Sequence, residues 1–309
     1  MEFSHYSVLL NETVDSLDIR KDGVYVDCTA GGGGHSKRIL ECLGENGRLI
    51  AIDRDPDAIS VLKERIGSDK RVTLVNDNFS NLEEILKEAG TDKVDGIIAD
   101  LGVSSFQLDE AERGFSLHND APLDMRMSRE GISAYDVVNT YEEKEIVRIL
   151  RSYGEEKFAS SIARNIVRER QKEPIENTLR LADIVKASIP AAARRTGGHP
   201  ARKTFQAIRI EVNNELEILE NTIDKMFDAL KTGGRLSIIT FHSLEDRIVK
   251  KHFASFCEGC VCPKEFPVCV CGRTPRGRLV FKFKTASENE LSENNRSRSA
   301  TLRSVEKIT

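Results

Sequence analysis

The sequence lacks the features that are typical of membrane proteins, of secreted proteins and of highly basic proteins that bind nucleic acid non-specifically. No apolar run approaches the roughly 18 residues that a membrane-spanning helix needs, and residues 1–5 show no signal-peptide pattern. An excess of positive charge is also missing, because 46 basic residues face 50 acidic ones and the net charge is −4. We therefore expect a cytoplasmic protein with no membrane partner, in which a local basic patch holds any polyanion.

The length and the apolar pattern predict the architecture. With 309 residues and 39% hydrophobic content, the chain can bury a full core and make two domains or one domain with an insertion. Between 107 and 205 the strand pattern vanishes and helical spacing replaces it. We predict an α/β fold with a doubly wound sheet, formed by 1–106 and 206–309, and an inserted all-helical domain at 107–205. The apolar runs that predict strands lie at 24–27, 48–53, 71–75, 94–100 and 235–241, with a closing antiparallel pair at 279–284 and 301–305.

The stretch from Val24 to Ser36 predicts a strand, a glycine loop and a helix start. A β-branched and aromatic run ends at Asp27, and four consecutive glycines from Gly31 to Gly34 follow it. Glycines allow positive φ and close approach of the backbone to a ligand. Exposed N–H groups at a helix start favour an anionic group. A tight turn without a ligand is the alternative interpretation.

Three predicted strands end in an aspartate, at Asp27, Asp53 and Asp100. The second of these lies about twenty residues after the glycines, where a ribose-binding carboxylate belongs. Solvation alone hardly explains acids at three strand ends, so we predict a cofactor crevice there. Phe79, in the loop after the third strand, is a candidate apolar wall of an adenine pocket.

Two cofactor classes use this layout, namely dinucleotides and S-adenosylmethionine. A dinucleotide fingerprint needs glycine or alanine three residues after Gly33, where Ser36 stands. Asp27, placed before the glycines, suits the amino group of a methionine moiety and would repel a pyrophosphate. The pattern therefore favours S-adenosylmethionine, and an NAD-dependent oxidoreductase is the alternative.

The second half of the chain adds candidate substrate contacts. The basic loop 194–203 ends in Arg202 and Lys203 and is the best candidate for a phosphate contact, with a solvated loop as the alternative. Residues 203–230 carry an apolar stripe that predicts one long helix packed on the sheet. After the fifth strand, Ser243 with Asp246 fits a helix cap. His242 has no such structural explanation, so it is a candidate substrate contact.

Five of the seven cysteines lie within fifteen residues. In a reducing cytoplasm this clustering favours a metal site over disulfides. Cys257 with Cys260 and Cys269 with Cys271 would supply four thiolates to a tetrahedral zinc. The Cys-x-Cys spacing is tighter than that of usual zinc fingers, however, and a loop rich in free thiols is the alternative. The sequence therefore assigns no metal ligand and leaves zinc binding open for Cys257, Cys260, Cys262, Cys269 and Cys271.

With these residues identified, the chain resembles the bacterial small-subunit ribosomal RNA cytosine-N4 methyltransferases of the RsmH (MraW) family. The matching segments run nearly from end to end and occur in the family's order. They are 5–12, 32–35, 51–56, 100–105, 111–116, 122–127, 204–207 and 241–247.

The resemblance implies a class I methyltransferase domain interrupted by a helical domain that recognises the substrate. It implies methyl transfer from S-adenosylmethionine to N4 of a cytidine in the decoding centre of 16S rRNA, within the small ribosomal subunit. Gly34, His35 and Gln107 become cofactor contacts on the resemblance alone. The full set of cofactor contacts carried over is Gly33, Gly34, His35, Asp53, Phe79, Asp100 and Gln107. A non-catalytic ribosome-assembly factor with the same fold is a further alternative.

The reaction needs a group that activates the target amine, because its lone pair is delocalised into the cytosine ring. Many amino-methyltransferases use an Asp/Asn-Pro-Pro-aromatic turn at the fourth strand for this purpose. Here Asp100-Leu101-Gly102-Val103 takes that place. Our hypothesis is that Asp100 is the catalytic residue, acting on the amine or on the cofactor.

Overall fold

The computed structural model describes residues 7–195, 198–263, 266–268 and 270–309. The chain divides into two compact units, one made of Met1–Gly102 with Leu216–Thr309 and the other of Val103–Glu215. The segment 107–205, predicted as an insertion, lies inside the second unit, which extends beyond it at both ends.

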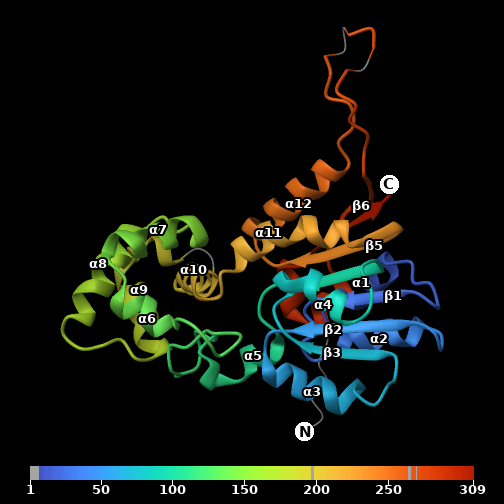
Figure 1. Ribbon diagram of the computed structural model, residues 1–309. Coiled ribbons are helices and arrows are strands. Elements are labelled where there is room, and N and C mark those ends of the chain that lie inside the picture. The colour runs from blue at the N-terminus through green and yellow to red at the C-terminus, as the bar shows by residue number, and fades with distance from the viewer. Residues whose placement is uncertain (1–6, 196–197, 264–265, 269) are drawn as a thin grey trace. The chain divides into compact units, whose positions relative to one another are not determined.

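The first unit is built on one sheet, for which the described residues supply seven strands in the order β3-β2-β1-β4-β5-β7-β6 (Figure 1). Strands β3 to β5 of this order are parallel, and β7 runs antiparallel to both β5 and β6. This confirms the predicted doubly wound sheet and its closing antiparallel pair. The strands are β1 (Val24–Asp27), β2 (Arg48–Asp53), β3 (Val72–Asn76), β4 (Val94–Asp100), β5 (Leu230–Thr240), β6 (Gly277–Lys284) and β7 (Thr301–Lys307).

The central strands bury both of their faces. Successive residues of a strand point to opposite sides, so Ile50 and Ile52 pack with α4, α11 and α12, whereas Leu49 and Ala51 pack with α1, α2 and α3. A continuous apolar run is what this two-sided burial requires. The helices of this unit are α1 (Leu10–Ser16), α2 (Gly34–Cys42), α3 (Pro56–Ile66), α4 (Leu82–Glu88), α11 (Glu215–Asp228), α12 (Ser243–Phe256) and α13 (Glu288–Glu293).

The second unit is helical and has its own core. Its amphipathic helices bury their apolar stripes on one another, as α7 does with Ile146, Ile149 and Leu150. No helix in either unit, within the described ranges, has an apolar stretch long enough to cross a membrane. The helices of this unit are α5 (Ser105–Asp109), α6 (Ala134–Thr140), α7 (Glu143–Gly154), α8 (Ala159–Arg170), α9 (Thr178–Ser188) and α10 (Arg202–Asn213).

The prediction of a single long helix over 203–230 is wrong. The chain leaves the helical conformation at Asn214, whose φ of 49° lies in the left-handed region, and α10 and α11 are separate helices. Phe205 packs in the core of the helical unit, whereas Phe227 packs against the sheet. The apolar stripe is therefore shared between two cores.

Candidate active site

The candidate site lies at the carboxyl ends of β2, β1 and β4. Strand order reverses around β1, because β2 pairs with one of its edges and β4 with the other. Ligands of open α/β sheets bind in the crevice outside such a switch point. Asp27, Asp53 and Asp100 are the last residues of these three adjacent strands. The acids that the sequence singled out therefore share one edge of the sheet.

The glycine stretch forms the turn from β1 into α2, as predicted. Gly31 and Gly33 have φ values of 50° and 84°, which glycine adopts without strain. At Gly34, the first residue of α2, a side chain would collide with the side chain of Ser7. Backbone conformation thus favours glycine at positions 31 and 33, and close packing requires it at position 34.

Asp27 is a buried carboxylate held by its own loop and by α2. Its side chain is 1% exposed, and it accepts hydrogen bonds from the Ser36 hydroxyl at 2.7 Å and the Thr29 N–H at 3.2 Å. Burial raises the pKa of Asp27 to about 6, although both hydrogen bonds oppose the shift. These roles of Ser36 and Thr29 are not predictable from the sequence, because a hydroxyl in a loop or first helical turn carries no signature of its own.

Asp53 joins the loops that follow β1 and β2. Its Oδ2 accepts the N–H of Gly31 and its Oδ1 accepts the N–H of Asp55, each at 2.8 Å. Burial raises the pKa of Asp53 to about 6 against the effect of these two bonds. Each carboxylate oxygen keeps a further lone pair. The side chain can therefore also accept hydrogen bonds from hydroxyl groups, as a ribose contact requires.

Asp100 differs from the other two acids because one of its oxygens has no hydrogen-bond partner among the described residues. Its Oδ1 is buried and accepts no hydrogen bond from the described part of the chain, while its N–H donates to the Thr29 hydroxyl at 2.6 Å. Burial raises the pKa of Asp100 well above its usual range, and the charges of Asp27 and Glu245 raise it further. An unpaired buried acceptor is costly in the protein alone, so this oxygen is suited to a ligand.

His35 lies between the N-terminal segment and Asp100. The ring is 5% exposed in the first turn of α2. Its Nε2 lies 3.0 Å from the carbonyl oxygen of Val8, and its Nδ1 lies 3.9 Å from Oδ2 of Asp100, too far for a hydrogen bond. The family-derived expectation of a cofactor contact at His35 stays a prediction, at a position beside the candidate catalytic acid.

His242 caps α12, a role predicted from the sequence for Ser243 and Asp246. The predicted cap by Ser243 with Asp246 is wrong, because His242 is itself the N-cap of α12. Its Nδ1 accepts the N–H of Glu245 at 3.4 Å, and Oε2 of Glu245 accepts the N–H of His242 at 3.3 Å. Glu245, 2% exposed, was missed, although its place three residues after the cap is a capping-box signal. The substrate contact of His242 stays a prediction.

Phe79 and Gln107 both have structural roles. Phe79 begins the short 3₁₀ turn η1 (Phe79–Asn81) and packs against the sheet core. Gln107 belongs to the helical unit, where its Oε1 accepts the N–H of Ser104 at 3.1 Å and completes the capping box of α5. Their cofactor contacts stay predictions.

Arg202 and Lys203, the candidate RNA contacts, open α10 in the helical unit. Lys203 donates through Nζ to the carbonyl oxygen of Glu155 at 3.0 Å, where α7 ends. A cation at this end favourably meets the helix dipole. Arg202 is exposed. Of the same basic loop, residues 196–197 lie outside the described residues.

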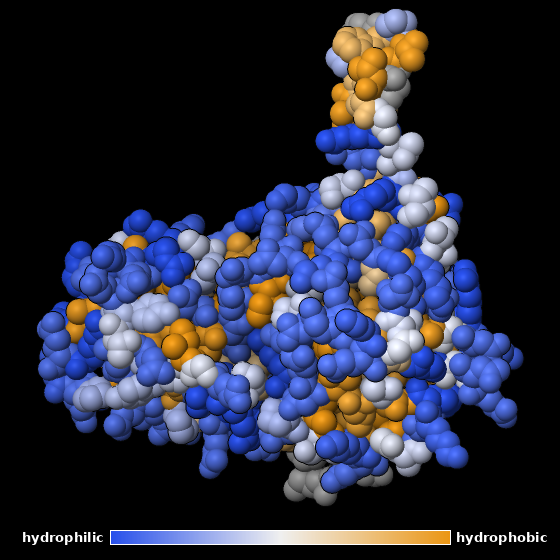
Figure 2. Space-filling view, viewed as in Figure 1, coloured by the Kyte–Doolittle hydropathy of each residue, from blue (hydrophilic) through white to orange (hydrophobic). Residues whose placement is uncertain are grey.

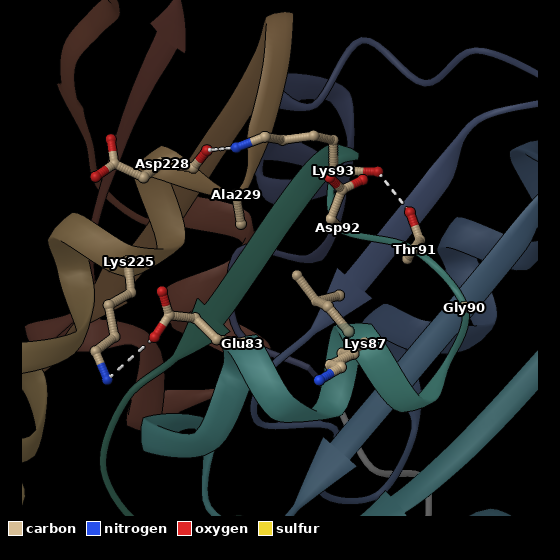
Figure 3. Close-up of a pocket in the computed structure, with 10 residues that line it drawn as sticks. Glu83, Lys87, Gly90, Thr91, Asp92, Lys93, Lys225, Asp228 and Ala229 are labelled. Carbon is tan, nitrogen blue, oxygen red and sulfur yellow. Dashed lines mark hydrogen bonds and ion pairs between the residues drawn. The ribbon is translucent and has the colours of Figure 1, made fainter.

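A separate pocket lies on the other side of the sheet from these carboxyl ends, where β4 begins (Figure 3). It has a volume of about 500 Å³ and is formed by the end of α4, the loop into β4 and the end of α11. Among its lining residues, Nζ of Lys93 donates to the carbonyl oxygen of Asp228 at 2.7 Å. Nζ of Lys225 lies 3.6 Å from Oε2 of Glu83. No candidate site residue from the sequence lines it. We therefore place the candidate active site at the carboxyl edge.

The carboxyl edge has the chemistry expected for S-adenosylmethionine. Three carboxylates would repel a pyrophosphate, whereas they pair with an amino group, a positive sulfur and ribose hydroxyls. The unpaired Oδ1 of Asp100 provides an acceptor at the same edge. The residues present therefore fit this cofactor and disfavour the dinucleotide alternative.

Comparison with known proteins gives matches along the whole chain. Residues 2–308 match the MraW methylase family. The chain is 57% identical over 310 residues to the ribosomal RNA small subunit methyltransferase H of Clostridium botulinum, covering 100% of both chains. It is 54% identical over 311 residues to the protein of the same name from Lachnospira eligens, covering 100% of this chain and 99% of the relative. For the Paenibacillus sp. protein of that name, identity is 56% over 315 residues, with 99% and 100% covered.

Proposed function

This chain belongs to the MraW methylase family, and from that premise we propose that it methylates N4 of a cytidine in the decoding centre of 16S rRNA. The family inferred from the sequence motifs is thus confirmed. The protein is a methyltransferase that uses S-adenosylmethionine and acts on small-subunit ribosomal RNA. The structural observation that supports the proposed chemistry is the buried Oδ1 of Asp100 at the switch point of the sheet, which accepts no hydrogen bond from the described residues.

Asp100 is proposed to activate the target amine. S-adenosylmethionine, when bound, supplies a methyl group on a positively charged sulfur. Oδ1 of Asp100 can accept an N–H of the amine, which draws the hydrogen out of the ring plane and localises the nitrogen lone pair. As the N–C bond forms, the nitrogen must lose a proton. Because its pKa is raised, the Asp100 carboxylate is a better proton acceptor than an ordinary aspartate.

The other two acids are proposed to position the cofactor. Asp27, at the end of β1, faces the loop and helix start with a carboxylate suited to an amino group. Asp53 has free lone pairs for ribose hydroxyls. Holding donor and acceptor in line lowers the barrier without any further chemistry from these residues.

The helical unit is proposed to recognise RNA around the target. A cytosine must leave its stack before its N4 amine can reach a crevice, and folded RNA is recognised mainly by shape and phosphate contacts. Arg202, exposed at the start of α10, is the side chain that we propose for a phosphate contact in this unit.

The experiment that tests the function is transfer of labelled methyl from S-adenosylmethionine to small subunits that lack decoding-centre modifications. Nucleoside analysis of the product is expected to place the label in N4-methylcytidine. Label in another nucleoside would contradict the proposed target atom. RNA binding without transfer, on mature subunits and on assembly intermediates alike, would favour the assembly-factor alternative.

Replacing Arg202 by alanine is expected to weaken RNA binding several-fold and to reduce the slope of log affinity against log salt by about one, as loss of one phosphate contact does. Lys203→Ala is the matched comparison. Because Lys203 is bonded to the end of α7, its replacement is expected to change the slope less and to lower helical-unit stability. Equal salt slopes for Arg202→Ala and the unmodified protein would contradict the phosphate contact.

A further inference from the structure

The segment between α12 and β6 forms an extended arm of the first unit (Figure 1). Its described residues form neither helix nor strand. Two limbs run side by side, because Arg273 on the returning limb lies 3.7 Å from Glu258 on the outgoing limb. Near the tip, side chains that are half or more exposed include Val261, Val268 and Val270 (Figure 2). The described residues near the tip form no hydrophobic core that would fix its conformation, so another constraint is needed.

Three thiols from the two limbs meet near the tip of this arm. The Sγ atoms of Cys260, Cys262 and Cys271 all lie within 4.8 Å of one another. The Sγ atoms of Cys260 and Cys271 are 3.7 Å apart. Sulfur ligands about 2.3 Å from a tetrahedral zinc lie about 3.8 Å from each other, whereas disulfide sulfurs are about 2.05 Å apart. The separation therefore matches two ligands of one metal.

The backbone around the thiols also suits a metal site. The N–H of Val270 donates to Sγ of Cys262 across the arm at 3.4 Å. A hydrogen bond of this kind stabilises the negative charge of a thiolate ligand. Gly272, directly after Cys271, has a φ of 62°, and no atom of the described residues lies within 4 Å of where its Cβ would be. Glycine is favoured here by its positive φ rather than by a lack of space.

We propose that Cys260, Cys262 and Cys271 supply three of the four ligands of a structural zinc ion that orders the arm, and we assign no described residue to the fourth position. Each thiol loses its proton on binding, and zinc undergoes no redox change. The ligand set differs from the one considered from spacing, because Cys262 takes the place of Cys257. Cys257 packs against the sheet core at the end of α12. Cys269 lies outside the described residues. This inference does not depend on the proposed RNA substrate.

The test is metal analysis of the full chain, purified with a reducing agent and without chelator. We expect about one zinc per chain. Replacement by Co²⁺ is expected to give a thiolate-to-cobalt charge-transfer band in the near ultraviolet. Cys262→Ser is expected to lower zinc affinity at least tenfold, whereas Cys257→Ser and the distant Cys42→Ser retain the metal. Added chelator is expected to speed tryptic cleavage after Arg273.

Absence of zinc from the unmodified protein, together with no thiolate band at micromolar cobalt, would overturn the proposal. Loss of metal in Cys257→Ser with retention in Cys262→Ser would overturn the ligand set. Cleavage that chelator leaves unchanged would overturn the ordering role. Because the unmodified chain is tested directly, the outcome holds even where a variant folds poorly.

Discussion

Replacing Asp100 by asparagine is expected to lower kcat for methyl transfer by about 10²- to 10⁴-fold at saturating cofactor. Asparagine has nearly the same shape and can still accept a hydrogen bond, but it cannot take up a proton. The pKa of Asp100 is raised by burial and by the charges of Asp27 and Glu245. Since the deprotonated form is the acceptor, activity of the unmodified enzyme should fall as the pH is lowered through this raised pKa.

The measurement is single-turnover methylation of small subunits across a pH series. The residual activity of Asp100→Asn is expected to lack the acidic limb of the profile. Asp95→Asn is the matched control, because Asp95 lies on the same strand at its amino end, where it pairs with Lys231 at 2.7 Å. Full turnover of Asp100→Asn at saturating cofactor would exclude a catalytic need for the carboxylate.

Replacing Asp27 by asparagine is expected to stabilise the cofactor-free protein at pH 7.5 by about 3 kcal/mol. The native pKa of Asp27 is about 6, against 3.8 for an exposed aspartate, and about two pKa units correspond to about 3 kcal/mol. Because the folded state binds the proton more tightly, the unfolding free energy of the unmodified protein should fall as pH rises from about 4 to about 6. The asparagine side chain carries no charge to bury, and the Ser36 hydroxyl can turn to accept its N–H.

Denaturant unfolding of both proteins between pH 4 and 8 measures this effect. The variant should show a flatter pH dependence and weaker cofactor binding, which is the usual exchange between stability and function. Asp95→Asn is again the control, and its loss of a charge partner should lower stability instead. A lower unfolding free energy for Asp27→Asn than for the unmodified protein at pH 7.5 would contradict the prediction that the buried charge of Asp27 destabilises the native state.

The sequence by itself determined the sheet, the glycine turn and the acids at the strand ends. These features depend on signals within a few residues: an apolar run such as 48–53, four adjacent glycines, or a carboxylate where a run ends. Parallel strands then bring Asp27, Asp53 and Asp100 to one edge, whatever the details of packing. The candidate crevice followed from this, and the family followed from motifs of several residues in a fixed order.

Only the tertiary structure decided which distant residues meet. An apolar stripe does not show which core it packs against. The break at Asn214 between two cores therefore could not be predicted from the pattern of 203–230. The cap of α12 depends on the backbone conformation of His242. Likewise, spacing alone paired Cys257 with Cys260, whereas the end of α12 packs Cys257 against the core and the returning limb brings Cys271 to Cys260 and Cys262. Contacts between segments far apart in sequence are set by packing, which local patterns do not encode.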